Sequence, residues 1–447
     1  MLNYIWLALV VLAVAIGGWN NRLSEVTAGA FDGAKTAVTI ALGLIGIMAL
    51  WLGVMRLAER AGLVQRIARG LRPIMRRLFP DVPPEHPAMG SMLMNMAANM
   101  LGLGNAATPL GLRAMRDLET LNPRPGVASN AMCTFLAINT ASVQLIPATA
   151  IALLASAGST RPTAIVGTAL LATLCAATVA ITSAKILEKL PFFRLRETAP
   201  KTLTGIGEPG YRADAPNIFA AEELPVVARP RAWSWLVLGA LGLFFIALFI
   251  RIAFPALFNL PADPNAATQT AFVRSVNALS ILAIPFLLSF FPVYAATRGI
   301  KVYEEFVEGA KEGFGVILKI IPFLVTMLVA ISMFKGAGGI DLLTRLLTPV
   351  LAPLHFPTDL LPLALMRPLS GSATLAILTD IIHRLGPDNI VSLMAATIYG
   401  STETTFYVAA VYFGSVSIKQ TRHSIPAGLL GDLAGVIASV IICRAVL

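Results

Sequence analysis

Six stretches of this sequence run for 18 to 34 residues without a lysine, arginine, aspartate or glutamate. A helix needs about 20 mostly apolar residues to cross the hydrocarbon core of a bilayer. With 56% hydrophobic and only 13% charged residues, the chain is also too apolar for an ordinary soluble protein. We therefore expect transmembrane spans at residues 4–21, 36–55, 127–160, 162–184, 232–250 and 275–297.

Three further apolar stretches each contain a charged residue. They are residues 315–334 with Lys319, residues 389–418 with Glu403, and residues 424–443 with Asp432. Ionisable side chains inside a membrane are costly and usually serve a function. We expect these stretches to be spans as well, and their charges to mark functional positions.

A repeat relates the two ends of the chain. Residues near the start recur 276 positions later: Gly33-Ala34-Lys35 as Gly309-Ala310-Lys311, Ala61-Gly62 as Ala337-Gly338, and Pro73 as Pro349. Weaker matches at smaller offsets pair Leu103-Gly104 with Ser370-Gly371, and Gly167 with Gly428. The alternative is coincidence, because Gly and Pro are frequent in membrane helices. The repeat predicts two related halves, residues 1–190 and 232–447, joined by a polar linker at 191–231.

The span at 232–250 has no counterpart in the first half. One added crossing reverses the orientation of everything after it, so the two halves should be inverted. Lys and Arg in short loops favour the cytoplasmic side. With the N-terminus inside and residues 88–118 and 359–384 as re-entrant hairpins, 24 of the 34 basic residues lie on that side and nine on the other. The sequence thus predicts an all-α polytopic membrane protein with two inverted-topology repeats.

The first hairpin combines amides, hydroxyls and helix breakers. Within fifteen residues it contains Asn95, Asn99, Gly102, Gly104, Asn105, Thr108 and Pro109. Glycine frees the backbone and proline cannot donate a hydrogen bond, so we expect the helix to break here. Transporters use such breaks to bind polar solutes inside the membrane. A sharp turn between two packed helices is the alternative.

The second hairpin adds a permanent positive charge. Its polar residues and breakers are Arg367, Pro368, Ser370, Gly371, Ser372 and Thr374. An arginine at membrane depth needs an anionic partner. We expect Glu403 to be that partner, with Asp432 as the second choice.

Each half also contains a span with a polar centre. The centres hold Asn139, Ser142 and Gln144 in the first half, and Ser401, Glu403 and Thr404 in the second. We expect the two hairpins and the two polar-centred spans to meet near the midplane and bind a small polar solute. Small hydroxyl residues also let membrane helices pack closely, which would explain Ser142 or Thr404 individually.

Motifs for common enzyme chemistry are not evident. The sequence offers no phosphate-binding loop, zinc-ligand helix or nucleophile elbow. Cys133, Cys175 and Cys443 lie on separate apolar segments without the spacing of metal ligands. We therefore expect no catalytic activity, cofactor or metal cluster. Contact with anionic lipid headgroups beside the spans explains the net charge of +10. We expect no nucleic acid partner.

Several motifs resemble a known family. They are Phe79-Pro80-Asp81 with the His-Pro-Ala-Met-Gly run at 86–90, residues 102–111, Met366-Arg367-Pro368 with Ser370-Gly371-Ser372, and residues 400–407. Through these motifs the first half resembles spore maturation protein A and the second half resembles spore maturation protein B. The two are fused in this chain. These families are grouped with the nucleoside recognition or gate domains of concentrative nucleoside transporters and the ferrous iron transporter B membrane region.

The resemblance implies a transporter-like core without naming a ligand. It makes Asn95, Asn99, Asn105, Arg367, Ser370 and Glu403 the best site candidates. We expect a multi-pass protein of the bacterial inner membrane that moves a small polar solute, with or without a coupling ion. The protein could be a homo-oligomer. The alternatives are a membrane protein that organises partners without transport, and one that handles lipids.

Overall fold

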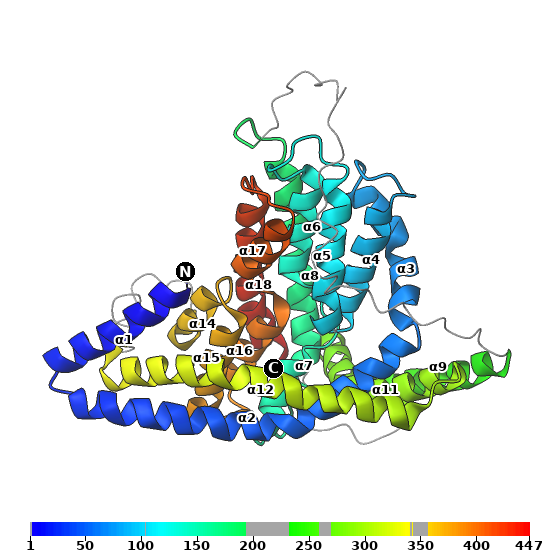
Figure 1. The fold of residues 1–447 in the computed structure, drawn as a ribbon. Coiled ribbons are helices and arrows are strands. Elements are labelled where there is room, and N and C mark those ends of the chain that lie inside the picture. The colour runs from blue at the N-terminus through cyan, green and yellow to red at the C-terminus, as the bar shows by residue number, and fades with distance from the viewer. Residues whose placement is uncertain (1, 103, 194–231, 259–269, 340–341, 343–355) are drawn as a thin grey trace.

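In a computed structural model, the described residues are 2–102, 104–193, 232–258, 270–339, 342 and 356–447 (Figure 1). They form helices, and a single isolated bridge joins Val127 to Gln420. Linker residues 194–231, Leu103 and Pro349 lie outside the described part of the chain. Five described helices, α2, α8, α9, α11 and α18, are long and apolar enough to cross a membrane, so the chain is an all-α polytopic membrane protein.

The helices fall into two similar series. The first is α1 (Leu2–Trp19), α2 (Leu23–Arg60), α3 (Leu63–Leu78), α4 (Pro87–Met100), α5 (Gly104–Glu119), α6 (Asn130–Ala141), α7 (Ala148–Ser156) and α8 (Ile165–Leu187). The second is α9 (Ala232–Ala253), η1 (Pro255–Phe258), α11 (Ala271–Thr297), α12 (Val302–Gly336), η3 (Thr358–Leu360), α14 (Leu361–Met366), α15 (Gly371–Leu385), α16 (Ile390–Ser401), α17 (Thr405–Ser415) and α18 (Ser424–Val446). Equivalent caps begin α6 and α16, where Ser129 Oγ accepts from Met132 N and Asn389 Oδ1 from Val391 N.

The two longest helices, α2 and α12, lie side by side along the lower edge of Figure 1. They run antiparallel, because Gly33 of α2 packs against the backbone of Leu328, and the equivalent Gly309 packs against that of Leu52. Both helices are followed by a glycine in the left-handed region, Gly62 at φ 74° and Gly338 at φ 82°. The repeated glycines therefore occupy equivalent places. Antiparallel pairing is what inverted repeats require, and the orientation of the halves in a bilayer stays a prediction.

Both predicted hairpins are present as paired helices, α4 with α5 and α14 with α15. The first turns at Gly102, which has φ 74°. The expectation that Pro109 also breaks the helix is wrong, because Pro109 lies inside α5. The turn at Gly102 has already reversed the chain, and α5 continues through the proline.

The polar-centred spans are not continuous helices, which corrects the spans expected at 127–160 and 389–418. In the first half, helix is absent at residues 142–147, between α6 and α7. In the second half, it is absent at residues 402–404, between α16 and α17. Ser142 is left-handed at φ 35°, and Thr402 is extended at φ −143° and ψ 171°. Each half therefore brings two breaks into the protein, one in its hairpin and one in this span.

The short helices after these breaks are exchanged between two hydrophobic cores. One core combines α3, α4, α5 and α6 and parts of α2 and α11 with Tyr412 and Phe413 of α17. The other combines α12, α15, α16 and α18 and parts of α2, α8 and α11 with Ile151 and Leu154 of α7. The two halves consequently cross at their breaks.

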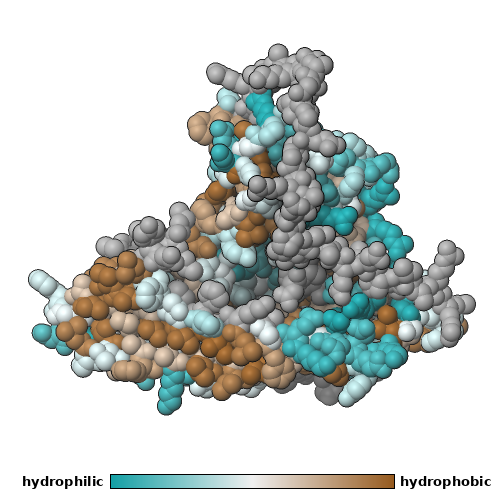
Figure 2. Space-filling model, viewed as in Figure 1, coloured by the Kyte–Doolittle hydropathy of each residue, from teal (hydrophilic) through white to brown (hydrophobic). Residues whose placement is uncertain are grey.

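Apolar side chains outside these cores cover the lower left of Figure 2, over α1, α2 and α12, as expected for a lipid-facing surface.

Candidate functional site

Backbone hydrogen bonds join the breaks of the two halves. The Leu145 amide donates to the Met100 carbonyl at 3.0 Å, and the Phe406 amide donates to the Pro368 carbonyl at 3.0 Å. Leu145 and Phe406 lie 261 positions apart, as do Gly167 and Gly428, so each half ties its broken span to its own hairpin in the same way. A third bond crosses between the halves, from the Glu403 amide to the Thr140 carbonyl at 2.7 Å.

Arg367 lies at the end of α14, with 2% of its surface exposed. Its Nη2 donates to the Tyr399 carbonyl at 2.8 Å, and its guanidinium lies 4.7 Å from the Tyr399 ring centroid. The same Nη2 is 3.9 Å from Glu403 Oε2, which confirms the predicted pair. The second choice, Asp432, instead accepts a hydrogen bond from Thr405 Oγ1 at 2.6 Å.

A network of side-chain amides links the first hairpin to α6 and α17. Asn95 Nδ2 donates to the Ala107 carbonyl at 2.7 Å and to Tyr412 Oη at 3.2 Å. Asn99 Nδ2 donates to Asn139 Oδ1 at 2.9 Å, and Tyr412 Oη reaches the same oxygen at 3.3 Å. Four helices, α4, α5, α6 and α17, are thereby held together by polar contacts in a protein interior, where such contacts are strong.

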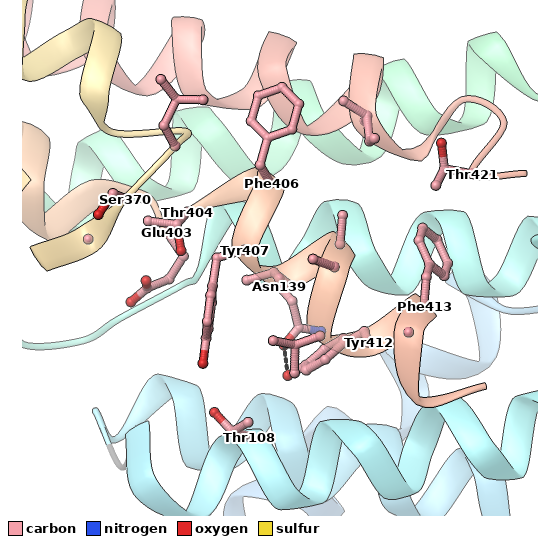
Figure 3. A pocket seen from close by; sticks show the side chains of 18 of the residues that line it. Thr108, Asn139, Ser370, Glu403, Thr404, Phe406, Tyr407, Tyr412, Phe413 and Thr421 are labelled. Carbon is pink, nitrogen blue, oxygen red and sulfur yellow. Dashed lines mark hydrogen bonds between the residues drawn. The ribbon is translucent and has the colours of Figure 1, made fainter. Parts of the chain in front are cut away.

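A cavity of about 1080 Å³ opens where these elements meet (Figure 3). Seven predicted site residues line it: Asn99, Thr108, Asn139, Ser370, Ser372, Glu403 and Thr404. Among the described lining residues Glu403 is the one carboxylate, and 38% of that side chain is exposed. In Figure 3, Glu403 and Ser370 lie at one end, and Tyr407 extends toward Thr108 across the space. The other end is mostly apolar, with Phe413, Ile418 and Ile425 among its lining and Thr421 as a polar residue there.

Six of the remaining predicted site residues have described side chains, and none of the six lines the cavity. Asn95 is buried in the amide network, Thr374 Oγ1 donates to the Ser370 carbonyl at 2.6 Å, and Ser401 Oγ donates to the Ile398 carbonyl at 3.0 Å. Arg367 and Ser142 are buried, and the half-buried Gln144 donates through Nε2 to Glu403 Oε1 at 3.4 Å. Gly104 begins α5, and the Asn105 side chain lies outside the described residues.

Two cavity tyrosines were not anticipated from the sequence. Tyr407 is 58% exposed on α17, and Tyr412 is 5% exposed one turn and a half further on. Tyr412 packs directly on Gly111 of α5, where a side chain would collide with its ring and hydroxyl. Tyr407 lies four residues after Glu403, and a polar residue so close to the expected site could have been considered from the sequence.

Comparison with known proteins agrees with the predicted resemblance. The family described as Gate, nucleoside recognition, matches residues 41–158 and 317–419. Spore maturation protein A of Bacillus subtilis is 44% identical over 197 residues, which are 44% of this chain and 98% of that protein. Spore maturation protein B of the same organism is 44% identical over 167 residues, 37% of this chain and 94% of that protein. The chain thus belongs to the family of spore maturation proteins A and B, with similarity to both in one polypeptide.

Proposed function

We propose that this protein transports a small polar solute across the bacterial inner membrane, binding it in the cavity beside Glu403. The observation that carries the proposal is a cavity lined by Ser370 and Glu403 at the two helix breaks of the second half, and by Asn99, Thr108 and Asn139 of the first half. Broken helices expose backbone groups, and inside a membrane such groups are stable only beside protein, water or a polar ligand. Secondary transporters place their substrates at breaks of this kind.

The lining chemistry favours a solute that donates hydrogen bonds. Glu403 accepts them through its carboxylate, and the hydroxyls of Ser370 and Thr404 can donate or accept. The solute needs no formal negative charge, because Arg367 is buried behind Glu403 and already paired with it. We therefore infer an uncharged or cationic solute. The name of the matched family makes nucleosides the first class to test.

An asymmetry between equivalent helices supports alternating access. Gly414 of α17 lines the cavity, whereas its equivalent Leu153 of α7, 261 positions earlier, is 2% exposed and packed into a core. The path along α17 is therefore open while the path along α7 is closed. Transport would require the opposite arrangement in a second state, in which α7 borders the cavity and α17 is packed.

The apolar end of the cavity favours lipid handling as a second candidate. Phe406, Phe413 and Ile425 could hold an acyl chain, while Glu403 and Ser370 face a polar headgroup. A lipid could enter or leave the cavity along α17, which carries the exposed Tyr407. Lipids belong in the same binding panel as the solutes.

Ligand-dependent thermal stability tests the proposal. Detergent-purified protein would be unfolded with nucleosides, nucleobases, amino acids, organic ions and short-chain lipids, using wild type, Glu403→Gln and the control Glu308→Gln. Glu308 is an exposed carboxylate on α12, paired with Lys311 at the surface. A bound ligand at 100 times its Kd stabilises the fold by about 2.7 kcal/mol. We expect a solute that stabilises wild type and Glu308→Gln but not Glu403→Gln. No response across the panel would instead support a protein that organises partners.

A further inference from the structure

Asp432 is a buried carboxylate that the solute site does not use. It lies in α18 with 3% of its surface exposed, facing the break between α16 and α17. Two glycines of the same helix allow this approach, since Gly428 packs on Thr405 and Gly435 packs on Thr402. Asp432 Oδ2 accepts from Thr405 Oγ1 at 2.6 Å, while Oδ1 has no partner among the described residues. A buried carboxylate with one oxygen unsatisfied is expensive if it is charged.

The charges around the breaks do not balance if every group is ionised. The charged groups acting on Asp432 are Arg367 and Glu403, so two carboxylates share one cation. Arg367 Nη2 is 3.9 Å from Glu403 Oε2, and Glu403 is 38% exposed to the cavity, where water can hydrate it. Asp432 has neither advantage. The negative charge is therefore more stable on Glu403, and one proton makes the group of three neutral.

We propose that Asp432 holds a proton when the solute site is at rest, and that release of this proton into the cavity accompanies solute movement. A proton fits better than a metal ion, because a hard cation needs about six oxygen ligands and, among the described residues, Asp432 is hydrogen-bonded to one oxygen, Thr405 Oγ1. This inference rests on the function proposed above for its role in transport, although the protonation of Asp432 does not.

Asp432 is linked to the cavity lining through one hydrogen bond and one peptide bond. Thr405, its hydrogen-bond partner, follows Thr404, which lines the cavity beside Glu403. The O–H bond at Asp432 breaks, the proton passes to cavity water, and the electron pair stays on the carboxylate. The new negative charge then competes with Glu403 for Arg367. Weakening of that pair leaves Glu403 free to accept a hydrogen bond from the solute, which couples proton release to solute binding.

Infrared difference spectroscopy on the full-length, solute-free protein tests the protonation directly. At neutral pH, wild type should show the carbonyl band of a protonated carboxyl group, and Asp432→Asn should lose that band. Asp32→Asn, a change to an exposed carboxyl on α2, should retain it. Glu403→Gln should weaken the band, because Arg367 then lacks its anion and favours the ionised form of Asp432. Asp432→Asn resembles the protonated acid in shape and charge, so its thermal midpoint should match that of wild type.

A second variant covers the case in which Asp432→Asn does not fold. Thr405→Val removes the hydroxyl that stabilises the ionised carboxylate, so the band should persist to higher pH than in wild type. An absent band in wild type, or a band unchanged in both variants, would overturn the proposal. A carboxylate band that shifts with sodium at constant pH, in wild type but not in Asp432→Asn, would overturn it in favour of a sodium site. Because no solute is present, these results do not depend on whether the protein transports.

Discussion

The Glu403 amide donates a hydrogen bond to the Thr140 carbonyl at 2.7 Å, so the break of the second half is held against the last turn of α6 in the first. Glu403 occupies the position equivalent to Ser142, 261 residues earlier. The residue whose carboxylate is exposed in the cavity thus also joins the two halves through its backbone amide. Movement of either half relative to the other would change the surroundings of that carboxylate.

Replacing Arg367 by Met should destabilise the protein. The substitution leaves the Tyr399 carbonyl without its donor and Glu403 without its cation. We expect a loss of roughly 3 kcal/mol, the lower end for breaking a buried pair, because Glu403 can be hydrated from the cavity. Chemical or thermal unfolding in detergent measures this. The exposed Arg69→Met serves as the control, and equal midpoints for the two variants would contradict the assigned role of Arg367.

Gly111 and Tyr412 should be coupled energetically. A methyl group at Gly111 collides with the Tyr412 ring and hydroxyl, so Gly111→Ala should cost about 1–3 kcal/mol in wild type. In a Tyr412→Ala background the same change should cost much less, because the colliding ring has gone. A double-mutant cycle of unfolding free energies measures the coupling. Additive effects of the two substitutions would show that α5 and α17 do not pack as described.

The repeated glycines of α2 and α12 should respond alike. Gly33→Ala meets the Leu328 carbonyl oxygen at 2.7 Å, and Gly309→Ala meets the Leu52 carbonyl oxygen at 2.6 Å. Each should destabilise by about 1–3 kcal/mol, since backbone cannot easily move aside. Gly315→Ala in α12 meets nothing within 4 Å and should instead stabilise by about 0.5–1 kcal/mol. Thermal unfolding of the three variants checks this order, and a tolerant Gly33 or Gly309 would contradict it.

Asp388 should make stability depend on acid pH. The Ser159 hydroxyl and the Thr160 amide and hydroxyl donate to Asp388, which lowers the pKa of this carboxyl to about 2. A lowered folded-state pKa adds stability above the ordinary aspartate pKa of about 3.9, and this stability is lost as pH falls toward the lowered value.

Asp388→Asn should therefore unfold at a lower temperature than wild type near neutral pH. The difference should be modest, because the carboxylate lies near solvent, and it should shrink below about pH 4. Thermal midpoints of both proteins across this pH range provide the measurement. If the difference between the two thermal midpoints stayed the same at every pH, the charge of Asp388 would not stabilise the contact between the α7–α8 and α15–α16 turns.

The sequence predicted the features that depend on residue type alone. Gly33 and Gly309 marked the repeat because close backbone contact between α2 and α12 tolerates only the smallest residue. Arg367 and Glu403 could be paired in advance because a buried guanidinium requires an anion. The polar hairpins were recognisable because amides and breakers are rare in apolar spans.

Features set by packing between distant segments could not be predicted. The sequence around Tyr412 gives no sign that Gly111, 301 positions earlier, leaves space for its ring. The break at residues 402–404 follows from a run of hydroxyl residues that a continuous helix also tolerates. The exchange of α7 and α17 between the two cores depends on both breaks together, so neither half alone predicts it.

Solute uptake into proteoliposomes tests the central claim most directly. Purified wild type, Glu403→Gln and Glu308→Gln would be reconstituted at equal density, and uptake of a radiolabelled solute that stabilises wild type would be followed against empty liposomes. The proposed function predicts uptake by wild type and Glu308→Gln, and uptake at the level of empty liposomes for Glu403→Gln. Uptake by wild type no faster than by empty liposomes, with solute binding intact, would contradict transport through this cavity.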